Sequence, residues 1–219
     1  MTAAIICNGD FPKKEFPRYL IASADFIICC DGALKAYLRA MPSVFGGRKR
    51  LPDAIVGDMD SLSPVLQEEF SSRIVHYEEQ DYNDQTKAVR YLLETHPEVS
   101  EIHILGATGK RTDHTIGNVS LLMEYGRLFP EVKEKVLDMV SDNETMFPIW
   151  DTATISVGTG RKVSIFTPDN SLRIKSSGLE YSTENVTFDN WWKATLNRAV
   201  EDEITLELSH PSMVLLCLD

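Results

Sequence analysis

The sequence lacks the features that mark a membrane, secreted or nucleic-acid-binding protein. No apolar run approaches the roughly 20 residues that a membrane-spanning helix needs, so we expect no membrane partner. The first residues, MTAAIICNGD, have no basic segment and are typical of a strand rather than of a signal peptide. The chain has 22 Lys and Arg against 33 Asp and Glu, a formal net charge of -11. Because nucleic-acid binding needs basic surface to neutralise phosphates, this charge disfavours a nucleic-acid partner.

Cysteine is also scarce. The four cysteines have neither the spacing of a metal site nor that of a disulfide framework. All of them lie in apolar runs that we interpret as buried strands. We therefore expect reduced core thiols in a cytoplasmic protein. The four residues are Cys7, Cys29, Cys30 and Cys217.

Two common nucleotide-binding fingerprints are absent. The chain has no GxGxxG motif. The sequence Gly109-Lys110 fails as a P-loop because Arg111 replaces the required Ser or Thr, and Ile104 stands where the first glycine belongs. Gly106 and Gly109 nevertheless lie between a predicted strand and a predicted helix, where backbone N–H groups can face a phosphate.

The first 141 residues alternate between short apolar runs and helical patterns. Predicted strands cover residues 3–7, 26–30, 53–57, 73–77, 101–106 and 136–140. Predicted helices cover residues 17–24, 32–41, 63–72, 84–96 and 113–126. Because most strands are apolar throughout, we expect both faces of their sheet to be covered. The pattern predicts a Rossmann-like, largely parallel sheet with flanking helices in a domain of residues 1–141.

From residue 142 onward the periodicity changes to two. Apolar residues alternate with polar ones in TATISV (152–157) and in EITLELS (203–209). Turn residues separate such runs. This alternation predicts an antiparallel β-sandwich domain of residues 142–219.

Acidic side chains follow four successive predicted strands. They are Asp31, Asp58, Asp60, Asp81, Asp84 and Asp113. Ligands of an open parallel sheet bind beyond the carboxyl ends of its strands, so we expect these loops at one edge. For Asp84 or Asp113 alone, N-capping of a helix is the simpler explanation. Carboxylates crowded in four loops, however, repel one another unless a cation lies among them. Oxygen ligands without His or Cys favour Mg²⁺.

Two basic residues accompany these acids. Lys87 lies one turn into its predicted helix, and Arg111 precedes the helix that begins near Asp113. Lys87 alone would be interpreted as a solvated helix residue. With the acids beside it, we interpret both cations as candidates for phosphate contacts.

Four segments together resemble the motifs of the thiamin pyrophosphokinase family, in order and in approximate spacing. They are CDGA (30–33), GDMDS (57–61), EQDYNDQTKA (79–88) and GATGKRTDHTIGN (106–118). The later stretches VSIFTP and GLEYS resemble that family's C-terminal half. The resemblance implies an α/β catalytic domain that binds ATP and Mg²⁺, a β-sandwich that contributes to the thiamin site, and a homodimer with its sites at the interface. It also implies transfer of a pyrophosphoryl group from ATP to the hydroxyl of thiamin, which gives thiamin diphosphate and AMP.

The resemblance also implies roles for individual residues. The catalytic set is Asp58, Asp60, Asp84, Asp113, Lys87 and Arg111, and its four aspartates are the expected metal ligands. The expected nucleotide-binding positions are Asp31, Ser61, Gln80, Asp81, Gly106, Thr108, Gly109, His114 and Asn118. Asn197 matches a position of the family's thiamin pocket. Trp192 is a candidate thiamin contact on its residue type alone, because an aromatic face attracts a cationic heterocycle. We expect one of Trp191 and Trp192 to fill the sandwich core, since neighbours in a strand point to opposite faces.

The sequence departs from the family pattern at three positions. Asn83 stands where threonine is usual, Lys110 where a second glycine is usual, and Leu196 where serine usually precedes Asn197. The last departure leaves open an enzyme with the same chemistry on another hydroxymethyl heterocycle, such as a pterin. A noncatalytic sensor of thiamin or nucleotide is the alternative from another class. Either Asp60 or Asp84 could take the proton of the acceptor hydroxyl.

Overall fold

The computed structural model describes residues 1–219, which form two compact units. The first unit contains residues 1–121 and 134–142, and the second contains residues 122–133 and 143–219. Each unit has its own cluster of buried apolar side chains.

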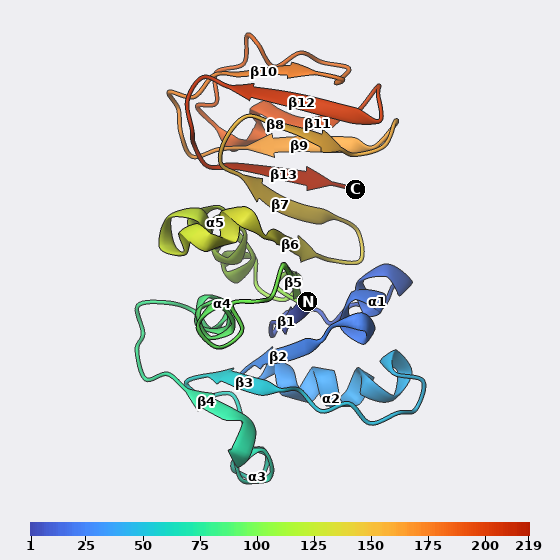
Figure 1. The fold of residues 1–219 in the computed structure, drawn as a ribbon, viewed down its shortest axis with the longest axis vertical. Coiled ribbons are helices and arrows are strands. Elements are labelled where there is room, and N and C mark those ends of the chain that lie inside the picture. The colour runs from blue at the N-terminus through green and yellow to red at the C-terminus, as the bar shows by residue number, and fades with distance from the viewer. The chain divides into compact units, whose positions relative to one another are not determined.

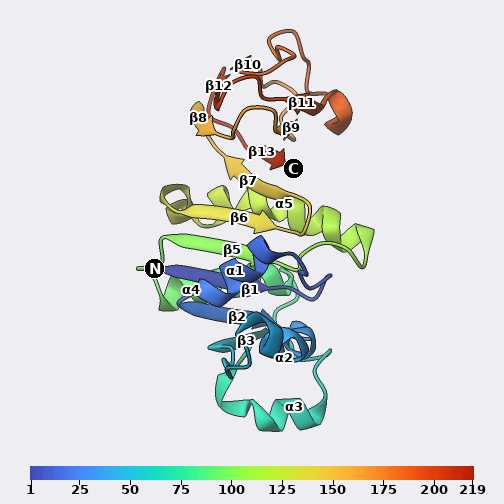
Figure 2. The same ribbon diagram turned by 90° about the vertical axis from the view of Figure 1, so that its right-hand side faces the viewer.

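The first unit is built on a parallel sheet, as the sequence predicts. Its strands are β1 (Thr2–Ile6), β2 (Phe26–Cys30), β3 (Ala54–Gly57), β4 (Ile74–His76), β5 (Glu101–Leu105) and β6 (Val136–Val140), in the spatial order β6-β5-β1-β2-β3-β4 (Figures 1 and 2). All neighbouring pairs among them are parallel. The order reverses beside β1, and a reversal of this kind opens a crevice at the carboxyl edge of a sheet.

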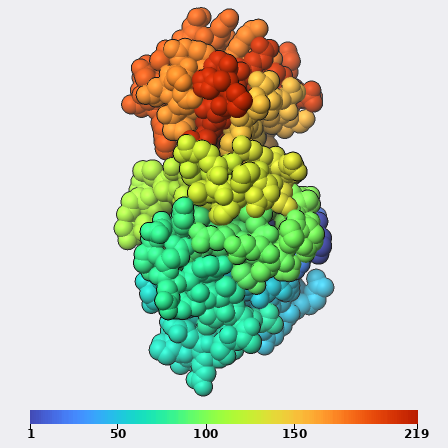
Figure 3. Space-filling model, turned by 60° about the vertical axis from the view of Figure 1, so that its left-hand side comes forward, coloured from blue at the N-terminus to red at the C-terminus, as the bar shows by residue number.

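Helices cover the sheet of the first unit on both faces. They are α1 (Glu15–Ser23), α2 (Ala33–Val44), α3 (Pro64–Glu69) and α4 (Asp84–Thr95), with a short 3-10 turn at Ser71–Arg73. Helix α5 (Thr112–Leu128) begins in the first unit and ends in the second, which also contains most of the 3-10 turn Pro130–Glu134. Apolar residues of α1 and α2, such as Ile21, Leu34 and Tyr37, pack on one face of the strands. Helix α4 packs against β1 to β3 from the other side (Figure 1). In the space-filling view of Figure 3, the segment that contains α3, β4 and α4 is coloured turquoise to green.

The strands of the second unit pair in two antiparallel sets. One set, part of a ten-stranded sheet, has the order β11-β9-β13-β7, and the other, a separate three-stranded sheet, has the order β10-β12-β8. The strands are β7 (Thr145–Ile149), β8 (Ala153–Ser156), β9 (Lys162–Phe166), β10 (Ile174–Ser177), β11 (Ala194–Arg198), β12 (Glu203–Leu208) and β13 (Val214–Leu218). Inward residues of both sheets, among them Ile165, Leu206 and Leu216, form one buried cluster. The predicted β-sandwich is therefore confirmed.

The prediction for the two adjacent tryptophans is wrong. Trp191 and Trp192 lie in a short 3-10 turn, Trp191–Lys193, rather than in a strand. Their residues are 39% and 66% exposed, so neither fills the sandwich core. Successive side chains of a 3-10 turn are only about 120° apart, which allows both rings to stay outside. The ring of Trp191 packs edge-on against Phe166 at a centroid distance of 6.1 Å.

Candidate active site

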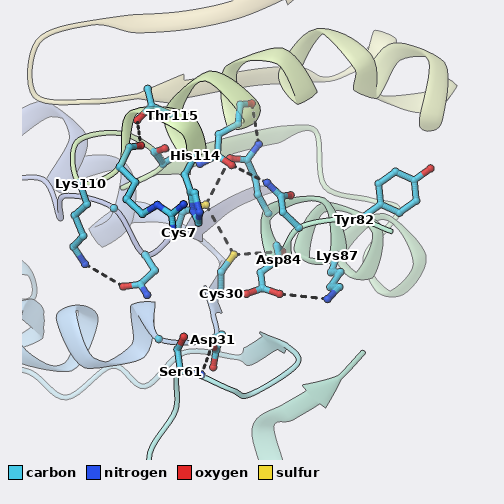
Figure 4. A pocket seen from close by; sticks show the side chains of 18 of the residues that line it. Cys7, Cys30, Asp31, Ser61, Tyr82, Asp84, Lys87, Lys110, His114 and Thr115 are labelled. Atoms are coloured by element: carbon cyan, nitrogen blue, oxygen red, sulfur yellow. Dashed lines mark hydrogen bonds and ion pairs between the residues drawn. The ribbon is translucent and has the colours of Figure 1, made fainter. Parts of the chain in front are cut away.

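A polar cavity of about 570 Å³ lies at the carboxyl edge of the parallel sheet (Figure 4). Its walls are the loops that follow β1 to β5, together with the first turns of α4 and α5. Most of the predicted site residues line it: Asp31, Asp58, Asp60, Ser61, Gln80, Asp84, Lys87, Thr108, Arg111, His114 and Asn118. Asp81, Gly106, Gly109 and Asp113 belong to the same loops but do not line the cavity. Trp192 and Asn197 belong to the second unit.

Three carboxylates gather in this cavity. Asp31, Asp58 and Asp60 each offer one oxygen, and these oxygens lie within 4.8 Å of one another. Asp31 is 3% exposed; its Oδ2 accepts a hydrogen bond from the Ser61 backbone N–H at 3.0 Å, whereas its buried Oδ1 has no hydrogen-bond partner. Because burial disfavours the charged form, the pKa of Asp31 is raised. A buried, unpartnered carboxylate oxygen beside two further carboxylates fits a cation ligand.

The loop between β3 and α3 holds two of these acids in place. The Gln80 side-chain amide donates to Asp58 Oδ2 at 3.2 Å, and the Asp60 backbone N–H donates to Asp58 Oδ1 at 3.2 Å. These two bonds lower the pKa of Asp58. Met59, between the two aspartates, has φ 65°, a conformation that costs energy for a residue other than glycine. Such strained loops are common where a structure presents functional groups.

Glycine at position 57 allows two acids to approach each other. A Cβ at Gly57 would lie 3.0 Å from the Asp31 Cβ and 3.0 Å from the Asp84 carboxyl carbon. Any side chain there would therefore push Asp31 and Asp84 out of their positions. The glycine that ends β3 is therefore required both by this close approach and by its φ of 154°.

Asp84 and Lys87 form a pair inside the cavity (Figure 4). The N-cap of α4 is Asn83, whose side chain accepts a hydrogen bond from the Thr86 backbone N–H at 3.0 Å, so Asp84 does not act as the cap. Lys87 is only 1% exposed, and its Nζ lies 3.6 Å from Asp84 Oδ1. Lys87 is therefore not a solvated helix residue. Burial, opposed by the Lys87 charge, raises the pKa of Asp84 to about 6.

Arg111 and Asp113 form a second pair, which is exposed. Their side chains are 67% and 63% exposed, and Arg111 Nε donates to Asp113 Oδ1 at 3.1 Å. The same oxygen accepts a hydrogen bond from the His114 backbone N–H at 2.9 Å. The hydrogen bond from Arg111 lowers the pKa of Asp113 well below its usual range. The three-carboxylate cluster does not include Asp113.

The structure adds site residues that sequence reasoning missed. Asn8 follows β1 and lines the cavity, and its Oδ1 accepts a hydrogen bond from Lys110 Nζ at 3.2 Å. A Cβ at Gly9 would lie 2.3 Å from the Thr108 carbonyl oxygen, so the loops after β1 and β5 touch. The acids were found by asking which residues follow the carboxyl ends of the strands, and the same question points to Asn8. It was missed because Asn8 carries no charge.

In the second unit, the predicted thiamin contacts differ in exposure. Trp192 is exposed, and the Lys193 ammonium lies 4.8 Å from its ring centroid. Asn197 is 5% exposed, and its side chain bonds both the backbone N–H of Tyr181 at 3.1 Å and its carbonyl at 2.7 Å. Leu196 is 76% exposed with φ 59°, at an irregular pairing of β11 with β9. Asn197 therefore anchors the segment at Tyr181, and Leu196 projects outward.

The first unit has the arrangement of an enzyme that acts on phosphorylated substrates. Acids suited to a hard cation, a buried lysine and backbone N–H groups at the start of a helix share the carboxyl edge of a Rossmann-like sheet.

No helix of the structure combines the length and apolar character that a membrane crossing demands.

Comparison with known proteins identifies the family. Residues 17–136 match the model "Thiamin pyrophosphokinase, catalytic domain", and residues 145–215 match "Thiamin pyrophosphokinase, substrate-binding domain". The chain belongs to the thiamin pyrophosphokinase family, which confirms the resemblance found in the sequence.

Relatives and solved structures agree with this assignment. Thiamine pyrophosphokinase 3 of rice (Oryza sativa subsp. japonica) is 27% identical over 93% of this chain and 81% of its own length. Yeast thiamin pyrophosphokinase superposes with a TM-score of 0.78 at 19% identity, over 99% of this chain and 85% of the yeast chain. The Bacillus subtilis enzyme gives a TM-score of 0.75 at 18% identity, over 100% and 99% of the two chains. At these identities the structures establish the common fold.

Proposed function

We propose that this protein is a thiamin diphosphokinase. It transfers a pyrophosphoryl group from ATP to the hydroxyl of thiamin and releases AMP. The observation that carries the proposal is the cavity of the first unit, where three clustered carboxylates and the buried Lys87 share one edge of the sheet in a chain of this family. Family membership disfavours both the pterin-type pyrophosphokinase and the noncatalytic sensor.

Asp31, Asp58 and Asp60 are our proposed ligands for Mg²⁺. Their oxygens are close enough to share one ion, and the unpartnered Oδ1 of Asp31 gains a partner there. This set keeps two of the four ligands that the sequence predicts and adds Asp31. Asp84 and Asp113 instead pair with Lys87 and Arg111. When bound, Mg²⁺ neutralises charge on the phosphate oxygens of ATP.

The remaining residues of the cavity bind and orient the reactants. Lys87 supplies a fixed positive charge to the phosphates, and its burial strengthens that interaction because little water competes. The loop from Gly106 to Gly109 offers backbone N–H groups, and Arg111 adds an exposed cation at the entrance. Positioning of this kind provides most of the acceleration in phosphoryl transfers, which proceed by in-line displacement.

Asp84 is our choice for the base that accepts the hydroxyl proton of thiamin. The other candidate is Asp60. Burial raises the pKa of Asp84 to about 6, so Asp84 is ionised at neutral pH yet more basic than an ordinary carboxylate. The neighbouring Lys87 ammonium favours the ionised form before the proton transfer.

The two domains have different roles in the proposed reaction. Residues 1–141 bind ATP and Mg²⁺, and residues 142–219 contribute to the thiamin site and to the interface of a homodimer in the cytoplasm. The exposed ring of Trp192 suits a cationic thiazolium. Asn197 acts by holding the Tyr181 backbone.

A single reaction tests the proposal: purified protein, Mg²⁺ and ATP, with and without thiamin, followed by separation of the nucleotides. AMP that forms only with thiamin is the expected result. ADP in its place would mean that one phosphoryl group is transferred, and the proposal would fail. A hydroxymethyl pterin added instead of thiamin should yield no AMP. Nucleotide binding without any AMP would identify a sensor.

A further inference from the structure

Two cysteines that the proposed reaction does not use lie at the floor of the cavity. Cys7 follows β1, Cys30 ends β2, and their sulfur atoms are 3.9 Å apart (Figure 4). Both residues line the cavity, and they are 7% and 3% exposed. The other two cysteines are placed differently: Cys29 is fully buried in the core beneath α1 and α2, and Cys217 belongs to the second unit.

The backbone geometry suits a bond between the two sulfurs. Ile6 of β1 lies opposite Cys29 of β2, so the next positions along these parallel strands are Cys7 and Cys30. Adjacent strands are about 4.8 Å apart, and disulfides join Cα atoms separated by about 4.4–6.8 Å. The side chains already point toward each other, and closure to about 2.05 Å needs a sulfur displacement of about 2 Å.

We propose that Cys7 and Cys30 are a modification site at which a small organic disulfide oxidises the pair to an intramolecular disulfide. Cys7, the more exposed thiol, loses its proton to water and attacks one sulfur of the reagent RSSR. The products of this step are a mixed disulfide on Cys7 and one RS⁻. Cys30 then loses its proton and attacks the Cys7 sulfur, which releases the second RS⁻. Two protein thiols are oxidised, and one reagent disulfide is reduced to two thiols.

The new bond would act directly on the proposed active site. Cys30 directly precedes Asp31, a proposed metal ligand whose φ of 36° is uncommon for a residue other than glycine. The Cys30 thiol also contacts the Asp84 carbonyl oxygen at 3.5 Å, and it loses its hydrogen on oxidation. Oxidation would therefore displace the backbone that carries Asp31 and Asp84. This consequence for activity, unlike the bond itself, rests on the proposed function.

The test treats the protein with hydroxyethyl disulfide and follows two readouts. Intact mass and a peptide map should show the loss of two hydrogen atoms and a link between the Cys7 and Cys30 peptides. Thiamin-dependent AMP formation should fall by at least about 10-fold and return with dithiothreitol. In Cys30→Ala the reaction should end at the mixed disulfide on Cys7, which the mass of the treated variant shows against the mass of the same variant before treatment. Cys217→Ala is the matched control and should behave as the parent protein does.

The two readouts separate the outcomes. No link between Cys7 and Cys30, or a link that involves Cys29 or Cys217, would overturn the modification site. A Cys7–Cys30 link without a change in AMP formation would overturn its control of the active site. A link in a protein that forms no AMP even when reduced would support the modification site and contradict the proposed function instead.

Discussion

The floor and the rim of the cavity hold the same kinds of side chain in opposite surroundings. On the floor, Asp31 and Lys87 are 3% and 1% exposed. On the rim, Arg111 lines the cavity and binds Asp113 beside it, and both side chains are more than 60% exposed. Charges act strongly on a substrate where water is excluded, whereas exposed charges are screened by solvent and salt. The difference predicts that changes on the floor abolish function and that changes on the rim only weaken it.

The largest effect is expected from Asp31→Asn. The amide oxygen can keep the hydrogen bond from the Ser61 backbone, but the unpartnered oxygen and its charge are lost. We expect kcat to fall by about 10²–10³, the cost of removing one preorganised electrostatic contact. Steady-state AMP formation measures it. Asp25→Asn is the matched control, because Asp25 precedes the opposite end of the same strand. Near-normal turnover of Asp31→Asn would remove Asp31 from the site.

The pH dependence of kcat/KM tests the Asp84–Lys87 pair. A base must be ionised to accept a proton, so kcat/KM should rise about tenfold per pH unit below a pKa of about 6 and level off above it. Lys87 lowers the pKa of Asp84, so in Lys87→Met the inflection should move to higher pH. The same inflection in both proteins would show that Asp84 is not the group that titrates.

A smaller effect is expected on the rim. Arg111→Gln removes an exposed cation and leaves Asp113 without its main partner. We expect KM for ATP to rise by about 3–10-fold with little change in kcat, since solvent and salt screen an exposed charge. Raising the salt concentration should reduce the difference from the parent protein. A loss of kcat as large as that of Asp31→Asn would refute the distinction between floor and rim.

The smallest effect concerns a buried pair outside the cavity. His103 on β5 is 6% exposed, and its Nδ1 lies 2.8 Å from Asp138 Oδ1 on β6. Burial lowers the pKa of His103, but the bond and charge of Asp138 together with the charge of Glu101, 3.7 Å from Nε2, outweigh burial, and the pKa is raised above 6.5. The stabilisation is therefore complete below the unfolded pKa of about 6.5 and is lost as pH rises through the folded pKa.

Urea unfolding at several pH values measures this effect. The free energy of unfolding should fall by about 1 kcal/mol more in the parent protein than in His103→Gln as pH rises from about 6 to 8.5. Parallel pH profiles for the two proteins would mean that the pKa of His103 is not raised in the folded protein.

Much of the first unit could be predicted from its sequence, because apolar strands and polar loops differ in composition. The apolar runs predict the strands, and the acidic loops that follow these runs predict the edge of the sheet where the acids lie. The association of Asp31 with Asp58 and Asp60 could not be predicted, since it depends on positive φ at Asp31 and Met59, which the residue types do not signal. The burial of Lys87 escaped prediction because Gln85, Thr86 and Lys87 of the first turn of α4 are all buried, although each is a polar residue.

The second unit was predicted in outline only. Strand β7 was missed because it contains Pro148, which argues against a strand; here Pro148 lies opposite Leu215 within a regular antiparallel pair. The turn at Trp191–Lys193 was missed because adjacent aromatic residues favour a strand. In both places the packing of neighbouring segments overrides the local preference.

Binding of Mn²⁺, an EPR-visible substitute for Mg²⁺, tests the central claim most directly and needs no turnover. We would titrate the parent protein, Asp31→Asn and Asp113→Asn in the presence of ATP. Our account predicts that Asp31→Asn weakens Mn²⁺ binding by at least about 10-fold and that Asp113→Asn leaves it within about twofold of the parent. Weaker binding in Asp113→Asn with unchanged binding in Asp31→Asn would place the ion at the rim and contradict the account.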